Sequence, residues 1–118
     1  MKRKYSLKEN HMFSKVYRRG RFFSAPLVVV YALKNYKTAA PAKIGFSVSA
    51  KHGGAVSRNR AKRLMREALR VLYPSLRIGF IYVISARAPL YSKNIKSPAV
   101  LADVKKCLRR LDLIKEND

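Results

Sequence analysis

Acidic residues are scarce in this chain of 118 residues, because six Asp and Glu stand against 27 Lys and Arg. The spacing of the six acids does not indicate the carboxylates of a two-metal catalytic site. The two histidines, His11 and His52, share no motif, and no set of Cys and His has the spacing of a zinc site. The sequence therefore predicts no catalytic residue and no metal site in this polypeptide.

Cysteine and long apolar runs are also scarce. Cys107 is the one cysteine, so no disulfide framework is possible, which is typical of a protein in the reducing cytosol. Its place in a helical pattern predicts a small apolar core residue. No run approaches the length of a transmembrane helix and no signal peptide opens the chain, so we expect a cytoplasmic protein without a membrane partner.

Positive charge is abundant, and the formal net charge is +21. Self-repulsion of this size opposes folding unless a polyanion neutralises it, so a partner with dense phosphates is the simplest interpretation. The hydrophobic content of 48% is ordinary for a folded chain, and the length suits one domain. We therefore expect a single domain over residues 1–118, with mobile ends at residues 1–5 and 114–118.

The chain is organised around the stretch Lys51 to Tyr73, in which two glycines precede a helical pattern. Its apolar residues have the spacing of one buried helix face, and they are Ala61, Leu64, Met65, Ala68, Leu69 and Leu72. The opposite, cationic face comprises Arg58, Asn59, Lys62, Arg63, Arg66 and Arg70, with Arg60 at its border. Like charges at these spacings repel, so we favour an anion-binding surface over a merely solvated face. The glycines lack the spacing of a nucleotide-binding P-loop.

A first helix is predicted to end by Arg19. The segment Ser6 to Glu9 has the form of a capping box at its start, and Gly20 suits the left-handed position after its end. The apolar stripe of this helix comprises Met12, Phe13, Val16 and Tyr17. The spacing favours core residues, but an aromatic stripe on a basic helix can also stack on unpaired bases.

Three segments have the composition of long strands, and they are 27–34, 43–49 and 77–87. The first two are predicted to pair as an antiparallel hairpin with a long loop, while 22–26 is a connection or a short leading strand. Both faces of 27–34 are apolar, so we expect both to be covered. In 43–49 the inward residues alternate with a small, polar face of Gly45, Ser47 and Ser49, which lets another chain come close.

A last helix is predicted from Ser97, as its cap, to about Leu113, with Pro98 in its first turn. The element order is then helix, strands, helix, strand, helix. This order predicts an α+β fold: a single small sandwich in which one mostly antiparallel sheet packs with three helices.

Several segments closely resemble the signature of the bacterial ribonuclease P protein component. They are Phe46 to Ser49, Lys51 with Gly53 to Val56, Arg58-Asn59-Arg60, Lys62-Arg63-Leu64 and Arg66-Glu67. The first helix and the strands around Tyr31 and Tyr82 are similar to that family too. The resemblance covers roughly residues 5 to 112. It implies a left-handed crossover from 43–49 through the central helix to 77–87, which the general preference for right-handed crossovers would not predict.

The resemblance also implies a function. In that family a large RNA is the catalyst, and magnesium ions held mainly by the RNA take part in removing the 5′ leader from precursor tRNA. The protein binds the catalytic RNA, in a 1:1 core complex, and the single-stranded leader; no obligate protein partner is expected. This role as a subunit of an endoribonuclease agrees with the missing catalytic residues.

The family's functional residues map onto this chain by motif. The RNA-binding positions are Arg58, Asn59, Arg60, Lys62, Arg63, Arg66 and Lys51. The positions of the leader-binding cleft are Phe13, Tyr17 and Tyr31. Guanidinium forks match phosphate oxygens, and lysine acts as a point charge. Two departures are Glu9, where relatives commonly carry a basic residue, and Leu113-Ile114, where some carry an aromatic residue.

Two other interpretations remain. A basic ribosomal protein with a structural role on ribosomal RNA would share the size, the charge and a similar sandwich. A protein-only nuclease would cleave tRNA precursors without an added RNA. An assay that combines protein, catalytic RNA and a 5′-extended tRNA separates all three.

Overall fold

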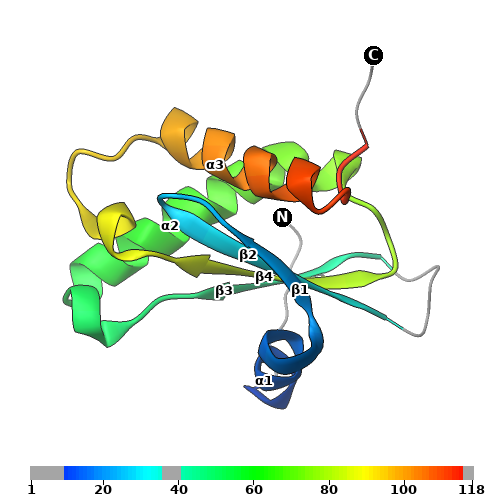
Figure 1. The fold of residues 1–118 in the computed structure, drawn as a ribbon. Helices are drawn as coiled ribbons and strands as arrows, with labels where there is room; N and C mark the ends of the chain where they lie inside the picture. Colours follow the sequence, from blue (N-terminus) through cyan, green and yellow to red (C-terminus); the bar gives the residue numbers. More distant parts are fainter. Residues whose placement is uncertain (1–9, 36–40, 116–118) are drawn as a thin grey trace.

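One four-stranded sheet carries two helices on one face and a third helix on the other (Figure 1). The computed structural model describes residues 10–35 and 41–115. The helices are α1 (Asn10–Arg19), α2 (Ala55–Leu72) and α3 (Ser97–Arg110). The strands are β1 (Arg21–Ser24), β2 (Val28–Lys34), β3 (Lys43–Ser47) and β4 (Phe80–Ala86). Short 3₁₀ helices are η2 (Ala50–His52), η3 (Tyr73–Ser75) and η4 (Ala88–Tyr91). The predicted α+β class and element order are confirmed.

The strand order is β1-β2-β4-β3, and it corrects the predicted hairpin of 27–34 with 43–49. β2 is antiparallel to β1 and β4, whereas β3 is parallel to β4. The four consecutive residues 81–84 are buried, so β4 needs cover on both faces and takes a central place between β2 and β3. β3 is partly exposed and lies at the edge. A short leading strand is present at this place, because β1 (Arg21–Ser24) pairs with β2, although it begins and ends before the expected 22–26.

The connection from β3 through α2 to β4 joins two adjacent parallel strands, as a crossover must. Its predicted left hand stays a prediction. Helix α2 crosses one face of the sheet, and the side of α2 that faces away from the sheet is exposed to solvent.

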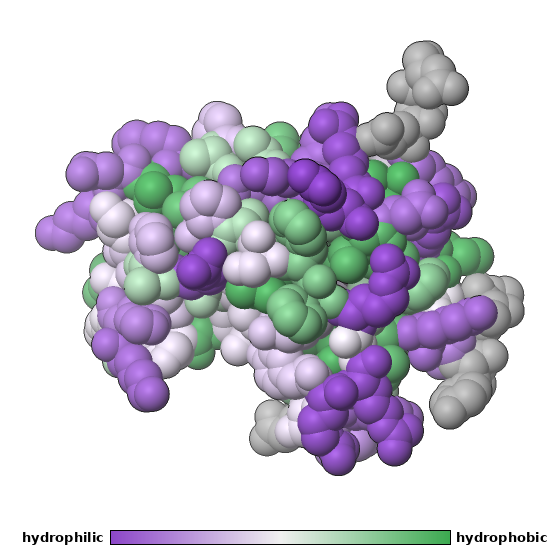
Figure 2. Space-filling view, viewed as in Figure 1, coloured by the Kyte–Doolittle hydropathy of each residue, from purple (hydrophilic) through white to green (hydrophobic). Residues whose placement is uncertain are grey.

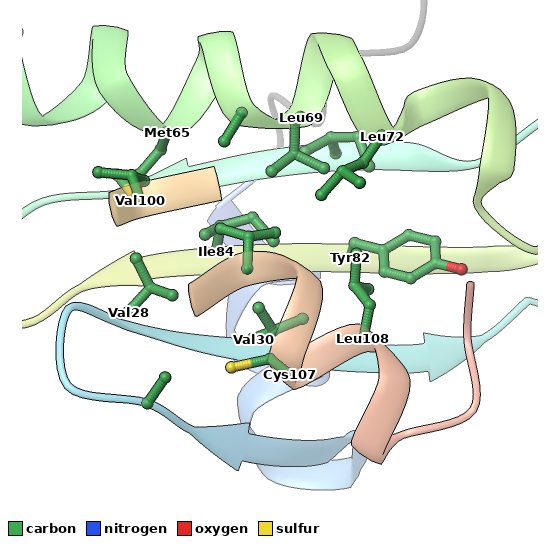
Figure 3. Packing of buried hydrophobic residues seen from close by; sticks show 14 of the residues in the cluster. Val28, Val30, Met65, Leu69, Leu72, Tyr82, Ile84, Val100, Cys107 and Leu108 are labelled. Carbon is green, nitrogen blue, oxygen red and sulfur yellow. The ribbon is translucent and has the colours of Figure 1, made fainter. Parts of the chain in front are cut away.

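The core lies between the sheet and the pair α2 and α3. All six predicted apolar residues of α2 are buried. Figure 3 shows Met65, Leu69 and Leu72 above Tyr82 and Ile84 of β4. Cys107 is buried on α3 among these residues, which confirms it as an apolar core residue. Burying each large aliphatic side chain stabilises the fold by about 1.5–3 kcal/mol, so α2 is held to the sheet mainly by this face.

Gly20 is required for close packing and not for a left-handed backbone. Among the described residues only Gly79 and Asp112 have φ angles in the left-handed region. A Cβ atom on Gly20 would lie 2.5 Å from the carbonyl oxygen of Val16 and 2.8 Å from that of Ala32. The prediction of a left-handed Gly20 is therefore wrong, because the close approach of α1 to β2 explains the glycine. The predicted capping box of Ser6 to Glu9 lies outside the described residues.

Both ends of α3 differ from the prediction. The residue that caps its start is Lys96, and Ser97 already lies inside the helix, with Pro98 in the first turn as predicted. At the other end Asp112 adopts φ 58° while the amide of Leu113 donates to the carbonyl of Leu108 at 2.9 Å. This is a Schellman-type stop, with Asp112 in the position that glycine usually takes, so α3 ends at Arg110 and not near Leu113.

The chain after α3 is held to the body of the protein. Ile114 is buried and forms an antiparallel bridge with Leu76, and the amide of Lys115 donates to the carbonyl of Ser75 at 2.7 Å. Residues 114 and 115, which the sequence assigned to a mobile end, thus have specific contacts with the segment after α2. Residues 1–5 and 116–118 lie outside the described part of the chain.

Candidate nucleic-acid interface

The outward side of α2 is a cationic surface. The helix carries six cations and one acid, and its apolar face is fixed against the sheet, so the charges are directed away from the core. Asn59, Arg63 and Arg66 are exposed, and Lys62 is half-buried. Within residues 10–35 and 41–115, the side chains of Lys62, Arg63 and Arg66 have no hydrogen bond or ion pair. The structure therefore brings these predicted residues together with their charges unneutralised.

A glycine loop leads into α2 and carries Lys51. The amide of Ser49 donates to the Tyr91 hydroxyl at 2.7 Å, and the amide of Lys51 donates to Ser49 Oγ at 3.1 Å. A Cβ atom on Gly53 would come within 2.8 Å of Ser57 Cβ, so glycine permits the tight entry into the helix. The Lys51 side chain is exposed at this corner. The loop before the cationic helix is thus fixed by Tyr91, which is distant in sequence, and by its close approach to Ser57 of α2.

Arg58 and Arg60 differ from the other arginines of α2, because protein carbonyls engage their guanidinium groups. Arg58 Nη1 donates to the carbonyl of Gly53 at a long 3.4 Å. Arg60 donates to three carbonyls of a loop after η4, at 2.6–2.9 Å. Both side chains are half-buried. Of the predicted RNA-binding arginines, Arg60 is therefore the one with the most complete set of partners inside the protein.

The predicted aromatic residues lie on the other face of the sheet, beside α1. Val16 is buried there with Ile81 and Val83, and Phe13 packs against this cluster. Phe13 is accordingly half-buried. Val16 and Phe13 thus hold α1 on the sheet. The spacing-based prediction of core residues is confirmed for Val16.

Three rings form an aromatic patch, which we define as Tyr17, Tyr31 and Phe22. The Tyr17 and Tyr31 rings meet edge to face, with centroids 4.8 Å apart, and Phe22 lies 5.7 Å from Tyr31. Tyr17 is 39% exposed and Phe22 is 62% exposed, while Tyr31 is half-buried. Burial raises the pKa of Tyr31, and the adjacent Tyr17 hydroxyl raises it further. The patch offers partly exposed ring surface that the packing has already ordered.

The sequence did not indicate two members of this surface, Phe22 and Ser85. Phe22 is directly opposite Tyr31 in the β1–β2 register, so both rings share one face. The Tyr17 hydroxyl and Ser85 Oγ form a hydrogen bond of 3.2 Å, which ties α1 to β4. Ser85 is paired with Ser47 of β3, so the small, polar face predicted for β3 continues the patch. The sequence left 22–26 open as a connection or a short leading strand, and so it did not indicate that Phe22 lies opposite Tyr31.

The cationic surface and the aromatic patch lie on opposite sides of the sheet. α2 packs on one face and α1 on the other (Figure 1). Figure 2 shows one side of the molecule, where hydrophilic residues gather over α1 and α3 and a less polar band lies between them. A nucleic acid held by α2 and another held at the patch would thus be separated by the sheet.

The described side chains do not fit a metal site. Within residues 10–35 and 41–115, no three His, Cys, Asp or Glu side chains gather closely enough to hold a metal ion. Over the same ranges, no helix is both long and apolar enough to cross a membrane.

The protein has a cationic helix on one face of a small α+β sandwich and packed aromatic rings on the other. These are features of a nucleic-acid-binding protein. The family model described as Ribonuclease P matches residues 1–112. The ribonuclease P protein component of Roseiflexus sp. (strain RS-1) is 35% identical over 118 residues, which cover 100% of this chain and 94% of that protein. The corresponding protein of Clostridium beijerinckii is 43% identical over 95 residues, covering 76% of each chain.

Solved structures agree with these relatives. The RNase P protein of Staphylococcus aureus superposes with a TM-score of 0.80 at 27% identity, covering 94% of this chain and 98% of that one. The RNase P protein of Thermotoga maritima has a TM-score of 0.76 at 24% identity and supports the fold alone. This chain belongs to the ribonuclease P protein family.

Proposed function

We propose that this chain is the protein subunit of ribonuclease P, the endoribonuclease that matures the 5′ ends of tRNA precursors. The family match over residues 1–112 supports the role. The observation that carries it is the cationic side of α2, where Lys62, Arg63 and Arg66 have no hydrogen bond or ion pair with any described residue. In this proposal the RNA subunit is the catalyst. The chain contributes binding and orientation in the cytoplasm, with one protein per RNA subunit.

The cationic surface of α2 binds the RNA subunit in this proposal. Arg63 and Arg66 carry guanidinium forks that match phosphate oxygens two at a time, and they meet no competing carboxylate in the described protein. Lys62 on the same helix and Lys51 in the loop before it act as point charges. Asn59 can donate and accept a hydrogen bond at once, which suits a position between two arginines. Arg58 and Arg60 donate to protein carbonyls as well.

The aromatic patch binds the unpaired 5′ leader of the substrate. Stacking of a base on an aromatic side chain contributes about 1–3 kcal/mol per base and depends little on sequence. Tyr17 and Tyr31 offer this surface, with Phe22 as a third ring and Phe13 as their inner support. The small residues Ser47 and Ser85 leave room beside the rings for a sugar–phosphate chain.

The reaction requires magnesium in this family, and in our proposal the RNA subunit holds the ions. The acids of the described chain are too dispersed to form an oxygen-ligand site of the kind magnesium needs. The protein acts instead through positive charge, because each phosphate that it neutralises lowers the repulsion between RNA segments.

A reconstitution assay at low magnesium tests the proposal. Protein, RNA subunit and a 5′-extended tRNA are combined, and release of the leader is measured. We expect the protein to stimulate cleavage strongly and to be inactive without the RNA. Absence of stimulation would refute the proposal, and binding to ribosomes without stimulation would favour a ribosomal protein. Leader removal by the protein alone would identify a protein-only nuclease.

A matched pair of variants connects the assay to α2. Arg63→Ala/Arg66→Ala removes two charges from the cationic surface. Lys43→Ala/Lys106→Ala removes two charges from exposed positions on β3 and α3. If α2 binds phosphates, the first pair reduces the slope of the logarithm of RNA affinity against the logarithm of salt concentration by about two. Each phosphate contact that is lost means that binding releases roughly one counterion fewer. The second pair leaves the slope nearly unchanged. Equal slopes for both pairs would exclude α2 as the RNA-binding surface.

A further inference from the structure

The Arg60 guanidinium joins α2 to a loop that is distant in sequence. Nη1 donates to the carbonyl of Ser92 at 2.7 Å, and Nη2 donates to those of Lys93 at 2.9 Å and Ile95 at 2.6 Å. These are charge-assisted hydrogen bonds, which are shorter and stronger than neutral ones. Three of the five N–H groups of Arg60 are therefore used inside the protein.

The loop that Arg60 engages is ordered by its own contacts too. It comprises residues 92–96, between η4 and α3. The amide of Asn94 donates to Ser92 Oγ at 3.3 Å, and the amide of Ile95 donates to the carbonyl of Ser92, also at 3.3 Å. Ile95 packs against the main core. The loop is thus fixed by packing of the Ile95 side chain against the core and by hydrogen bonds from the Arg60 guanidinium group.

The exposed residues of this loop are cationic or polar. Lys93, Asn94 and Lys96 are exposed, and neither lysine side chain has a partner within the described residues 10–35 and 41–115. Because Arg60 contacts the loop directly, both lysines lie near the first half of α2, which carries Asn59 and Arg63. A connection whose sole task was to lead into α3 would not require three charge-assisted hydrogen bonds from a helix that is distant in sequence.

We propose that loop 92–96 is a second phosphate-binding element, in which Lys93 and Lys96 contact the backbone of the RNA that α2 binds. Arg60 is its positioning residue, since it holds the loop against α2. The inference rests on the proposed RNA-binding function. A lysine on a fixed backbone loses less conformational freedom on binding than one on a mobile loop, so the anchor raises affinity without contacting RNA.

The loop itself is tested by removing its charges. Lys93→Ala/Lys96→Ala is compared with Lys43→Ala/Lys106→Ala, which loses the same charge elsewhere. We expect the salt slope of affinity for the RNA subunit to fall by about two for the loop variant alone, with an unchanged melting temperature. A slope equal to that of the control would overturn the proposal.

The positioning role is tested by Arg60→Lys and Arg60→Ala. Lysine keeps the charge but lacks the planar fork that reaches several carbonyls. We expect both variants to speed hydrogen exchange at the amides of Asn94 and Ile95 in the RNA-free protein, and both to weaken RNA binding. Rescue of binding by Arg60→Lys without restored protection would show that Arg60 contacts phosphate itself, and would overturn its assignment as a positioning residue.

These outcomes are separable from failure of the proposed function. If the unaltered protein does not bind or stimulate the RNA subunit, the function itself is wrong. If it does both, and Arg63→Ala/Arg66→Ala shifts the salt slope while the loop variant does not, only the loop proposal fails.

Discussion

Gly20→Ala is expected to destabilise the protein through two backbone contacts that an added methyl group cannot avoid. The new Cβ would lie 2.5 Å from the carbonyl oxygen of Val16 and 2.8 Å from that of Ala32. Both atoms belong to the main chain, so neither can rotate away, and α1 must shift relative to β2. Overpacking of this kind costs about 1–3 kcal/mol. For a domain of this size, that corresponds to a fall in melting temperature of roughly 4–12 °C.

The assay is urea unfolding of Gly20→Ala beside Gly54→Ala. Gly54 is a matched control because a Cβ atom there meets nothing within 4 Å and its φ angle is −77°. Alanine lowers the conformational entropy of the unfolded chain, which stabilises the protein, but it is less favourable than glycine at the N-cap of α2. The free energy of unfolding should therefore change by no more than about 1 kcal/mol. If both variants unfold at the same urea concentration, close approach does not explain Gly20.

Three further predictions follow from the site and the core. Tyr31→Ala and Phe22→Ala should each weaken binding of a leader-bearing substrate by about 1–3 kcal/mol while leaving leaderless tRNA unaffected, as measured by equilibrium titration; equal losses for both RNAs would contradict stacking. Burial raises the pKa of Cys107 to about 11 from 9.0, so the folded state retains the thiol proton longer than the unfolded chain. The free energy of unfolding should therefore decline between pH 9 and 11, and Cys107→Ala should decline less steeply. Sulfate should raise the melting temperature by binding the folded state, and an effect equal to that of a chloride salt at matched ionic strength would argue against a specific anion site.

The elements of the fold could be predicted from local pattern, whereas their order in the sheet could not. The apolar spacing of α2 determined its buried face, because a helix that covers a sheet exposes the opposite side whatever the topology. The pairing of β2 with β3 was the natural local expectation, and it failed because β4, from later in the chain, lies between them. The continuous apolar run at residues 81–84 was the signal in the sequence for a central strand.

The candidate site was predictable in composition and less so in detail. The residue types on α2 indicated anion binding, and the family resemblance supplied their roles. The position of Arg60 in the helical pattern does not show whether its side chain binds phosphate or holds a loop of the protein. Its carbonyl partners come from a loop 32–35 residues later in the chain. Phe22 was missed for a similar reason, because its exposure depends on the register of β1 against β2.

Strand β4 connects the two surfaces through neighbouring residues. Ile84 faces the core beneath α2, and Ser85, one peptide unit later, contacts Tyr17 on the opposite side. In the proposed assembly, the catalytic RNA and the leader therefore lie on opposite faces of one buried strand, and the packed layers of the protein set the distance between them. The protein would act as a rigid spacer, and any displacement of this strand would misalign both RNAs together.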